Sequence, residues 1–185
     1  MLFSFFPGVD YDGKPTTNIF KDYRFYFNRV IVNYKPRSYQ LTGTLRPEQL
    51  AENLYGQQQY YWVLLMLNGI YDPFYGWVTD QETAYQAAIQ RYSKVGGEQV
   101  LYHVDGEGNR YYNLTEDPEN PNHWYDKGDT NMLHLQHDGV LVPIDIYEDA
   151  VLQNESKRTI KIIDPSDIQS FVNDFIKEME KAISS

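Results

Sequence analysis

The 185-residue chain contains no cysteine. Disulfide bonds, thiolate metal sites and every mechanism with a cysteine nucleophile are therefore excluded. Long apolar runs are also missing, since the longest extends only from Tyr60 to Leu67 and a bilayer requires roughly 20 residues. The apolar start, Met1 to Pro7, has neither the basic leader nor the length of a signal peptide. We therefore expect a soluble protein that folds inside the cell in which it is made.

Positive charge is scarce, and the formal net charge is -10. Because phosphate binding relies on surplus lysine and arginine, nucleic acid is not expected as a partner. The charges are also unevenly distributed: residues 21–46 hold six basic residues and one acid, whereas 105–149 hold eleven acids and two bases. Either patch could be ordinary solvated surface. Such an asymmetry would also orient a protein among neighbouring subunits.

Recognisable catalytic motifs are missing as well. The chain has no G-x-S-x-G nucleophile elbow. Gly8 to Lys14 has the spacing of a phosphate-binding loop, but Pro15 stands where the metal-binding hydroxyl belongs, and Asp10 and Asp12 would repel phosphate. An acidic turn is the better interpretation.

Two segments resemble metal sites without meeting their requirements. His134 and His137 are separated by two residues, unlike the pair in a helical H-E-x-x-H site. Asp105 to Arg110 begins like a calcium loop, but Arg110 occupies the position that needs glycine. We therefore expect no metal, no cofactor and no enzymatic activity.

Tyrosine is abundant, with 17 residues, and aromatic residues make up 16% of the chain. Tyrosine combines a large apolar ring with a polar tip, so it suits surfaces that are wet in a monomer and buried in a complex. This composition favours extensive protein interfaces. Carbohydrate binding by stacked rings would use the same residues, and composition does not decide between the two.

Local patterns in the first half predict an α+β chain. Residues 1–38 are expected to form an irregular arm with one amphipathic segment, Ile19 to Val32. A strand from Tyr39 to Gly43, two helices and a second short strand should follow. Proline at the first turn and glycine or Asn-Gly at the ends predict the helices. These elements are Pro47 to Tyr55, Gln58 to Leu67, and the strand Trp77-Val78.

The middle of the chain is predicted to be a helix, a β-hairpin and a long loop. Thr79-Asp-Gln-Glu82 is a capping-box signature, with Thr79 as the expected N-cap. Gln99 to Val104 and Arg110 to Thr115 flank a glycine-rich turn that is typical of a hairpin. Glu116 to Asp138 is rich in Asp, Asn, Pro and Gly and is expected to be loop.

The C-terminal region is predicted to contain a helix from Tyr147 to Ser156, a strand from Thr159 to Ile163 and a final amphipathic helix. Asp164 should cap that helix and Pro165 should take its first position. Its apolar stripe must be buried, either on the protein's own core or on a partner as a docking element. The stripe consists of Ile168, Phe171, Val172, Phe175, Ile176, Met179 and Ile183.

The segment Arg46 to Asn68 resembles a LysM module, in which a strand, two helices and a strand enclose a small core. The matching core positions are Leu50, Ala51, Leu54, Trp62 and Leu65. The loops that this family uses for glycan depart from its pattern, at Gly43 to Pro47 and at Asp72 to Gly76. The resemblance therefore implies the fold without implying sugar binding.

A wider resemblance extends along nearly the whole chain to the gene 53 baseplate wedge protein family of T-even-like contractile-tailed phages. It implies a LysM-like domain within a virion tail baseplate subunit, made in the host cytoplasm, that joins neighbouring wedges into a ring around the central hub. The implied partners are other wedge proteins and the sheath-initiating protein. A peptidoglycan-binding LysM module is the alternative. The matching runs are Met1 to Phe6, Tyr61 to Met66, Tyr71 to Trp77, Val95 to Gly97, Tyr102 to Val104, Trp124 to Asp129 and Ile160 to Ile163.

We divide the chain into an N-terminal arm (1–38), a LysM-like module (39–80), a region with helix, β-hairpin and acidic loop (81–138), and a C-terminal helix-strand-helix region (139–185). Large apolar and aromatic residues outside the predicted module core are candidates for the interface with neighbouring subunits. These candidates are Tyr71, Phe74, Tyr75, Trp77, Trp124, Phe171, Phe175 and Met179.

Overall fold

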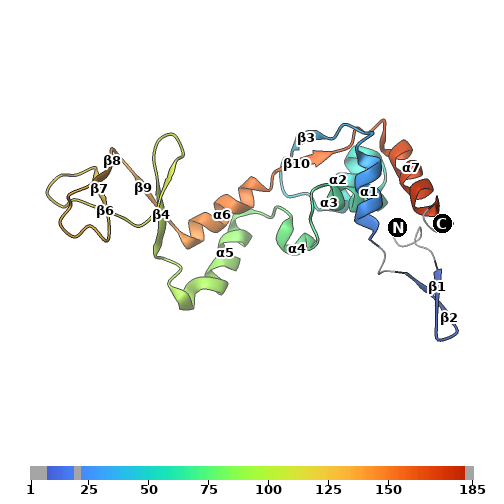
Figure 1. Ribbon diagram of the computed structural model, residues 1–185, viewed down its shortest axis with the longest axis horizontal. Coiled ribbons are helices and arrows are strands. Elements are labelled where there is room, and N and C mark those ends of the chain that lie inside the picture. Colours follow the sequence, from blue (N-terminus) through green and yellow to red (C-terminus); the bar gives the residue numbers. More distant parts are fainter. Residues whose placement is uncertain (1–7, 19–21, 182–185) are drawn as a thin grey trace. The chain divides into compact units, whose positions relative to one another are not determined.

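The protein is described by a computed structural model that covers residues 8–18 and 22–181 (Figure 1). It contains both helices and strands, in agreement with the predicted α+β class. The chain divides into two compact units, here called unit 1 (Met1–Val78 with Lys157–Ser185) and unit 2 (Thr79–Ser156). Unit 2 is therefore an insertion between two segments that together make unit 1. No helix within the described ranges is long and apolar enough to cross a membrane.

Unit 1 is mainly helical, with two small antiparallel sheets. One sheet is a hairpin of β1 and β2, and the other pairs β3 with β10. The helical elements are α1 (Tyr23–Ile31), α2 (Pro47–Tyr55), η2 (Gln58–Tyr60), α3 (Tyr61–Leu67), α4 (Pro73–Gly76) and α7 (Ile168–Lys181). The strands are β1 (Gly8–Tyr11), β2 (Lys14–Thr17), β3 (Arg37–Gln40) and β10 (Thr159–Ile162).

Local signals fix several of these elements where the sequence places them. Helix α2 has the predicted bounds, with proline in its first turn and Gly56 at its end in the left-handed conformation (φ 70°). The arm differs from the prediction, because its acidic segment forms the β1–β2 hairpin. Asp12 and Gly13 both have positive φ there, 54° and 72°, as tight hairpin turns require.

The partner of β3 comes from the far end of the chain. Gln40 pairs with Thr159 and Arg37 with Ile162 in an antiparallel ladder. The predicted strand at Trp77-Val78 is wrong: these residues are buried but form no strand. Because β10 alternates exposed and buried residues along its length, it can cover the core while its backbone pairs with β3.

The core of unit 1 brings α1, α2, α3, β10 and α7 together. Aromatic rings connect these elements: the Phe27 ring lies edge-on to Phe171 with centroids 5.1 Å apart, and Trp62 lies 5.5 Å from Phe175. Helix α7 lies beside α1 (Figure 1). It begins at Ile168, three residues later than expected, because Asp164 accepts from the Ser166 amide (3.1 Å) and closes a turn before the helix.

Unit 2 contains two helices and two three-stranded sheets. The sheets have the orders β5-β4-β9 and β6-β7-β8, and α5 packs against α6. The helical elements are α5 (Gln81–Tyr92), η3 (Ser93–Val95) and α6 (Ile146–Ser156). The strands are β4 (Val100–Val104), β5 (Arg110–Tyr111), β6 (Leu114–Glu116), β7 (His123–Asp126), β8 (Leu135–Asp138) and β9 (Val142–Asp145).

The predicted loop over 116–138 is wrong, because it contains β7 and β8. The turn-forming residues of this segment instead form the short connections between its strands. Asp117 accepts from the Glu119 amide (2.9 Å), and Asp129 accepts from the amides of Leu133 and His134 (2.9 and 2.8 Å). The cap of α5 also differs: the N-cap is Asp80 and not Thr79, because the Asp80 carboxylate accepts from the Thr83 amide (2.8 Å).

Candidate interaction surface

Three aromatic rings lie on one exposed turn of unit 1. The side chains of Tyr71, Phe74 and Tyr75 are 82%, 91% and 68% exposed. We call residues 71–75 the aromatic turn. Asp72 starts α4 by accepting from the Phe74 amide (2.9 Å), with proline next to it in the first turn. The short helix therefore holds the rings outward by local hydrogen bonding.

The base of the aromatic turn is fixed to the core of unit 1. Trp77 is buried, and its Nε1 donates to the Leu45 carbonyl (2.8 Å). The Lys157 ammonium donates to the Tyr75 carbonyl (2.7 Å), and burial lowers the pKa of Lys157. A Cβ atom on Gly76 would lie 2.7 Å from Ile70 Cγ2. These contacts hold the backbone of the aromatic turn in place while its rings stay exposed. A backbone that is already ordered loses less conformational entropy on binding.

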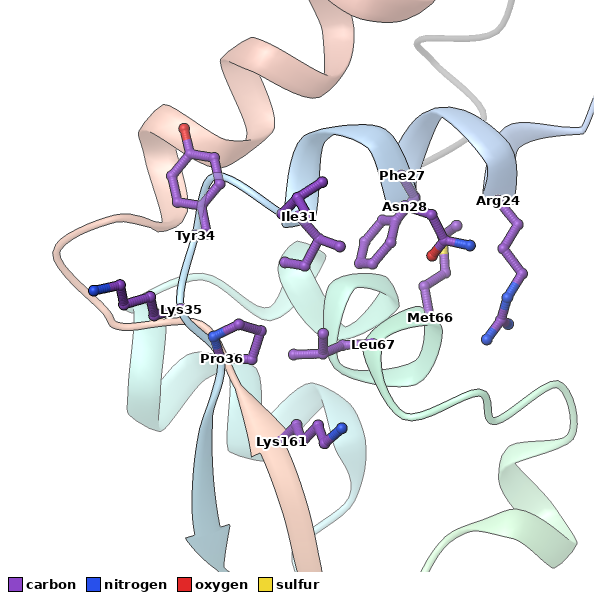
Figure 2. Close-up of a pocket in the computed structure, with 11 residues that line it drawn as sticks. Arg24, Phe27, Asn28, Ile31, Tyr34, Lys35, Pro36, Met66, Leu67 and Lys161 are labelled. Atoms are coloured by element: carbon purple, nitrogen blue, oxygen red, sulfur yellow. The ribbon is translucent and has the colours of Figure 1, made fainter.

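A pocket of about 500 Å³ opens next to α1 in the same unit. Its apolar part comes from α1 and α3, while Tyr34, Lys35 and Pro36 come from the segment that precedes β3 (Figure 2). No lining residue is a carboxylate, but three are cationic. The lining residues are Arg24, Phe27, Asn28, Ile31, Val32, Tyr34, Lys35, Pro36, Met66, Leu67 and Lys161. We call this site the basic pocket.

Arg24 joins the basic pocket to the aromatic turn. Its Nη1 donates to the Tyr71 hydroxyl (2.7 Å), and its guanidinium lies 5.2 Å from the centre of that ring. At the other end of the pocket, the Tyr34 hydroxyl donates to the Asp174 carboxylate (2.8 Å). Burial and this carboxylate raise the pKa of Tyr34 to about 12. The two features form one continuous surface of apolar and cationic groups.

The structure separates the predicted interface residues into two groups. Tyr71, Phe74 and Tyr75 are exposed on the aromatic turn. The other five are buried within the chain's own units, which corrects the expectation that they face partners. The buried five are Trp77, Trp124, Phe171, Phe175 and Met179.

Each buried candidate has an intramolecular reason for its position. Trp124 in unit 2 donates from Nε1 to the Gly139 carbonyl (2.9 Å). Phe171, Phe175 and Met179 line the face of α7 that packs into unit 1. Helix α7 is therefore a core element and not a free docking arm, since moving it away would expose most of the aromatic core to water.

Three of the five predicted module core residues lie in the core of unit 1, and the other two pack against it. Leu50 and Ala51 are fully buried, and Trp62 is 4% exposed. Leu54 and Leu65 are partly buried and pack against the same cluster. Asn68, the last residue of the segment that resembles a LysM module, binds β10 through its side chain. Its Oδ1 accepts from the Lys161 amide (2.7 Å), and its Nδ2 donates to the Lys161 carbonyl (2.9 Å).

Sequence reasoning did not single out Arg24, Lys35 and Lys161. The excess of basic residues over 21–46 signals two of them, but nothing local places Lys161 beside them. The structure also shows that charge divides by unit. Unit 2 holds 15 of the 26 acidic residues and 4 of the 16 basic ones. The formal charge is therefore -11 in unit 2 and +1 in unit 1.

Histidine and carboxylate side chains form no potential metal site in the residues that the structure describes, 8–18 and 22–181. His134 and His137 instead have separate roles. His134 contacts the Asp129 carboxylate (Nδ1 to Oδ2, 3.3 Å), and the His137 ring lies 4.7 Å from that of Tyr111.

Known proteins resemble this chain along almost its whole length. The family model described as Base plate wedge protein 53 matches residues 1–178. The baseplate wedge protein gp53 of Enterobacteria phage T4 is 50% identical over 191 residues, which cover 98% of this chain and 97% of that protein. The chain therefore belongs to the base plate wedge protein 53 family and is a structural subunit of a phage tail baseplate wedge.

Proposed function

We propose that this subunit joins neighbouring wedges into the ring around the central hub and that the aromatic turn is one of its contact surfaces. The observation that carries the proposal is the exposure of Tyr71, Phe74 and Tyr75 on a rigid turn, at 68–91% of each side chain. Large aromatic side chains are enriched at the centres of protein interfaces, where each buries a large apolar area.

The two units support a joining role because they differ in charge. A subunit that bridges two neighbours needs two separate surfaces, and surfaces of different charge select different partners. Unit 1 is close to neutral with a basic pocket, whereas unit 2 has a formal charge of -11. The proposed partners are other wedge proteins, the sheath-initiating protein and the neighbouring wedges.

We further propose that β3, α2, α3 and β10 make up the LysM-like module. Their order along the chain is strand, helix, helix, strand, and the two strands pair antiparallel. This assignment places unit 2 inside the module, between its second helix and its last strand. The sequence favoured the continuous segment 39–80, with Trp77-Val78 as the last strand. The proposed module has β10 as its last strand instead.

Complementation tests the proposed role of the aromatic turn. A phage defective in its own copy of the gene is grown in cells that supply the full chain, either wild type or Phe74→Ala with Tyr71→Ala. Complete baseplates are counted by electron microscopy. We expect the double variant to fold, as judged by thermal unfolding, and to reduce complete baseplates strongly because the lost rings would sit at an interface centre.

Phe25→Ala is the matched control for the phenylalanine change in the double variant, because Phe25 is 53% exposed on α1 of the same unit. It makes the same chemical change outside the aromatic turn and should assemble normally. Normal assembly of the aromatic-turn variant would show that these rings are not an interface.

A further inference from the structure

Four cations of unit 1 that lie outside the basic pocket are paired with carboxylates of the same unit. Arg29 pairs with Glu178 (3.1 Å), Arg37 with Asp164 (3.2 Å), and the two lysines of α7 contact carboxylates one turn away. Lys35 and Lys161 make no ion pair with any residue in the described ranges, and both are exposed at the pocket. Their charges are therefore available to a carboxylate from outside the chain.

The floor of the pocket is apolar. Phe27 is 1% exposed, and Ile31, Met66 and Leu67 are partly buried around it. In Figure 2, Arg24 and Lys35 lie at opposite ends of this row of side chains, and Lys161 reaches the site from β10. The arrangement combines a hydrophobic floor with a positively charged rim. Its volume falls within the range of about 300–1,000 Å³ that is usual for binding pockets.

We propose that the basic pocket binds an acidic segment of another baseplate protein, which inserts one large apolar side chain between flanking aspartates or glutamates. The inference rests on the proposed function, since it supplies the partner chemistry for the surface that includes the aromatic turn. Charge complementarity selects the occupant: three cations surround the floor and no lining residue is acidic. The apolar floor offers nothing to a phosphate backbone, so a protein segment fits better than nucleic acid.

Two residues suit the pocket to such a segment. Met66 is flexible and polarisable, so it can adjust to the shape of an inserted side chain. Arg24 contacts the Tyr71 ring and also lines the pocket, so a partner that covers the aromatic turn also meets this guanidinium. The basic pocket and the aromatic turn therefore bind one partner surface together.

Charge reversal tests the electrostatic part of the proposal. The full chain with Lys35→Glu and Lys161→Glu is supplied to the gene-defective phage, and infectious yield is measured. We expect the yield to fall by on the order of a hundredfold, because a carboxylate would then face like charges. Thermal unfolding of the purified variant should remain close to wild type, since both side chains are exposed.

The control is Lys94→Glu with Lys127→Glu, which changes the net charge equally but lies in unit 2 at exposed positions. It should leave the yield near wild type. Revertants of the pocket variant, selected as plaques, then identify the occupant. We expect second-site changes of Asp or Glu to Lys in another wedge protein. Changes of acidic residues in unit 2 of this chain would instead mark a second copy as the occupant and overturn the assignment.

Pocket blocking tests the apolar part separately. Asn28 lines the pocket from the exposed side of α1, so Asn28→Trp should fill the site and reduce the yield without removing any core residue. If both pocket variants assemble normally while the aromatic-turn variant fails, the pocket proposal is wrong and the joining function stands. If the aromatic-turn variant also assembles, both proposals are wrong.

Discussion

Phe171 provides the sharpest test of the way unit 1 is held together. The side chain is completely buried, and the residue lies in the first turn of α7. Its ring meets Phe27 and Tyr34 edge-on, with centroids 5.1 and 5.3 Å apart, and lies parallel to Phe175 at 6.3 Å. Phe27 in α1 and Tyr34 in the loop after it therefore both pack against one residue that lies far from them in sequence.

The expected cost of Phe171→Ala follows from this packing. Removing a buried phenylalanine ring costs about 3–5 kcal/mol, because transfer free energy is lost and the cavity does not fully close. The edge-to-face pairs with Phe27 and Tyr34 place the cost at the upper end, since each such pair contributes about 0.5–1.5 kcal/mol beyond area burial. Total stabilities of about 5–15 kcal/mol are usual. The variant should therefore lose a third or more of its stability.

Thermal unfolding followed by near-ultraviolet circular dichroism measures the effect. We expect the midpoint for unit 1 to fall by more than about 10 °C. Phe74→Ala is the matched control: it deletes the same ring where the side chain is 91% exposed and should shift the midpoint by only a degree or two. A small shift for Phe171→Ala would refute the reasoning, and so would a chain truncated before Pro165 that kept a cooperative transition for unit 1.

Three further predictions concern unit 2. Asn154→Ala should destabilise it by about 1–3 kcal/mol in urea titrations, because Asn154 is buried and pairs with both the amide and the carbonyl of Thr79 (3.0 and 2.8 Å); an unchanged midpoint would contradict this. Burial and the hydrogen bond to Asp149 raise the pKa of Tyr102 from 10.0 to about 12. The neutral phenol therefore stabilises the fold fully below pH 10, and this contribution is lost as the pH rises from 10 through 12; Tyr102→Phe should flatten the dependence in urea titrations over that range. Asp80→Ala should cost about 1 kcal/mol by removing the cap of α5, and far-ultraviolet circular dichroism with thermal unfolding would show whether the helix tolerates the loss.

The division into two units has a consequence for assembly. The chain leaves unit 1 after Val78 and returns to it at Lys157. The fold of unit 1 is therefore complete only when the chain from Lys157 onward is present. Strand β10 and helix α7 complete the sheet and the aromatic core. A chain truncated during synthesis would therefore lack both the core and the basic pocket, whose lining includes Lys161.

Features that depend on neighbours along the chain could be predicted from the amino-acid sequence. Helix α2 has the predicted bounds because Pro47 and Gly56 act locally, through a fixed φ at one end and a left-handed φ at the other. The turn at Asp105 to Asn109 is also local, since Asp105 accepts from the amides of Glu107 and Asn109 (both 2.9 Å). Family membership was readable for the same reason, because it rests on residue identity and order.

Strand pairing and exposure depended on residues that are distant in sequence. Nothing near Arg37 to Gln40 reveals that β10 is its partner, because 118 residues separate Gln40 from Thr159. Trp77 looked like a strand residue, but its indole fills the core and its N–H binds Leu45. A two-residue apolar segment carries too little periodicity to separate these outcomes.

Phe74 and Phe171 show most directly which properties depend on the tertiary structure. They are the same residue type, and both were candidates for an interface, yet one is 91% exposed and the other is completely buried. The difference arises because α7 packs its apolar face on α1. Phe74 lies instead on the exposed helix α4, which Asp72 caps and which is packed closely on Ile70 at Gly76. In the same way, only folding places Lys161 at the pocket with Lys35 and Arg24, because burial and charge proximity are properties of neighbours in space.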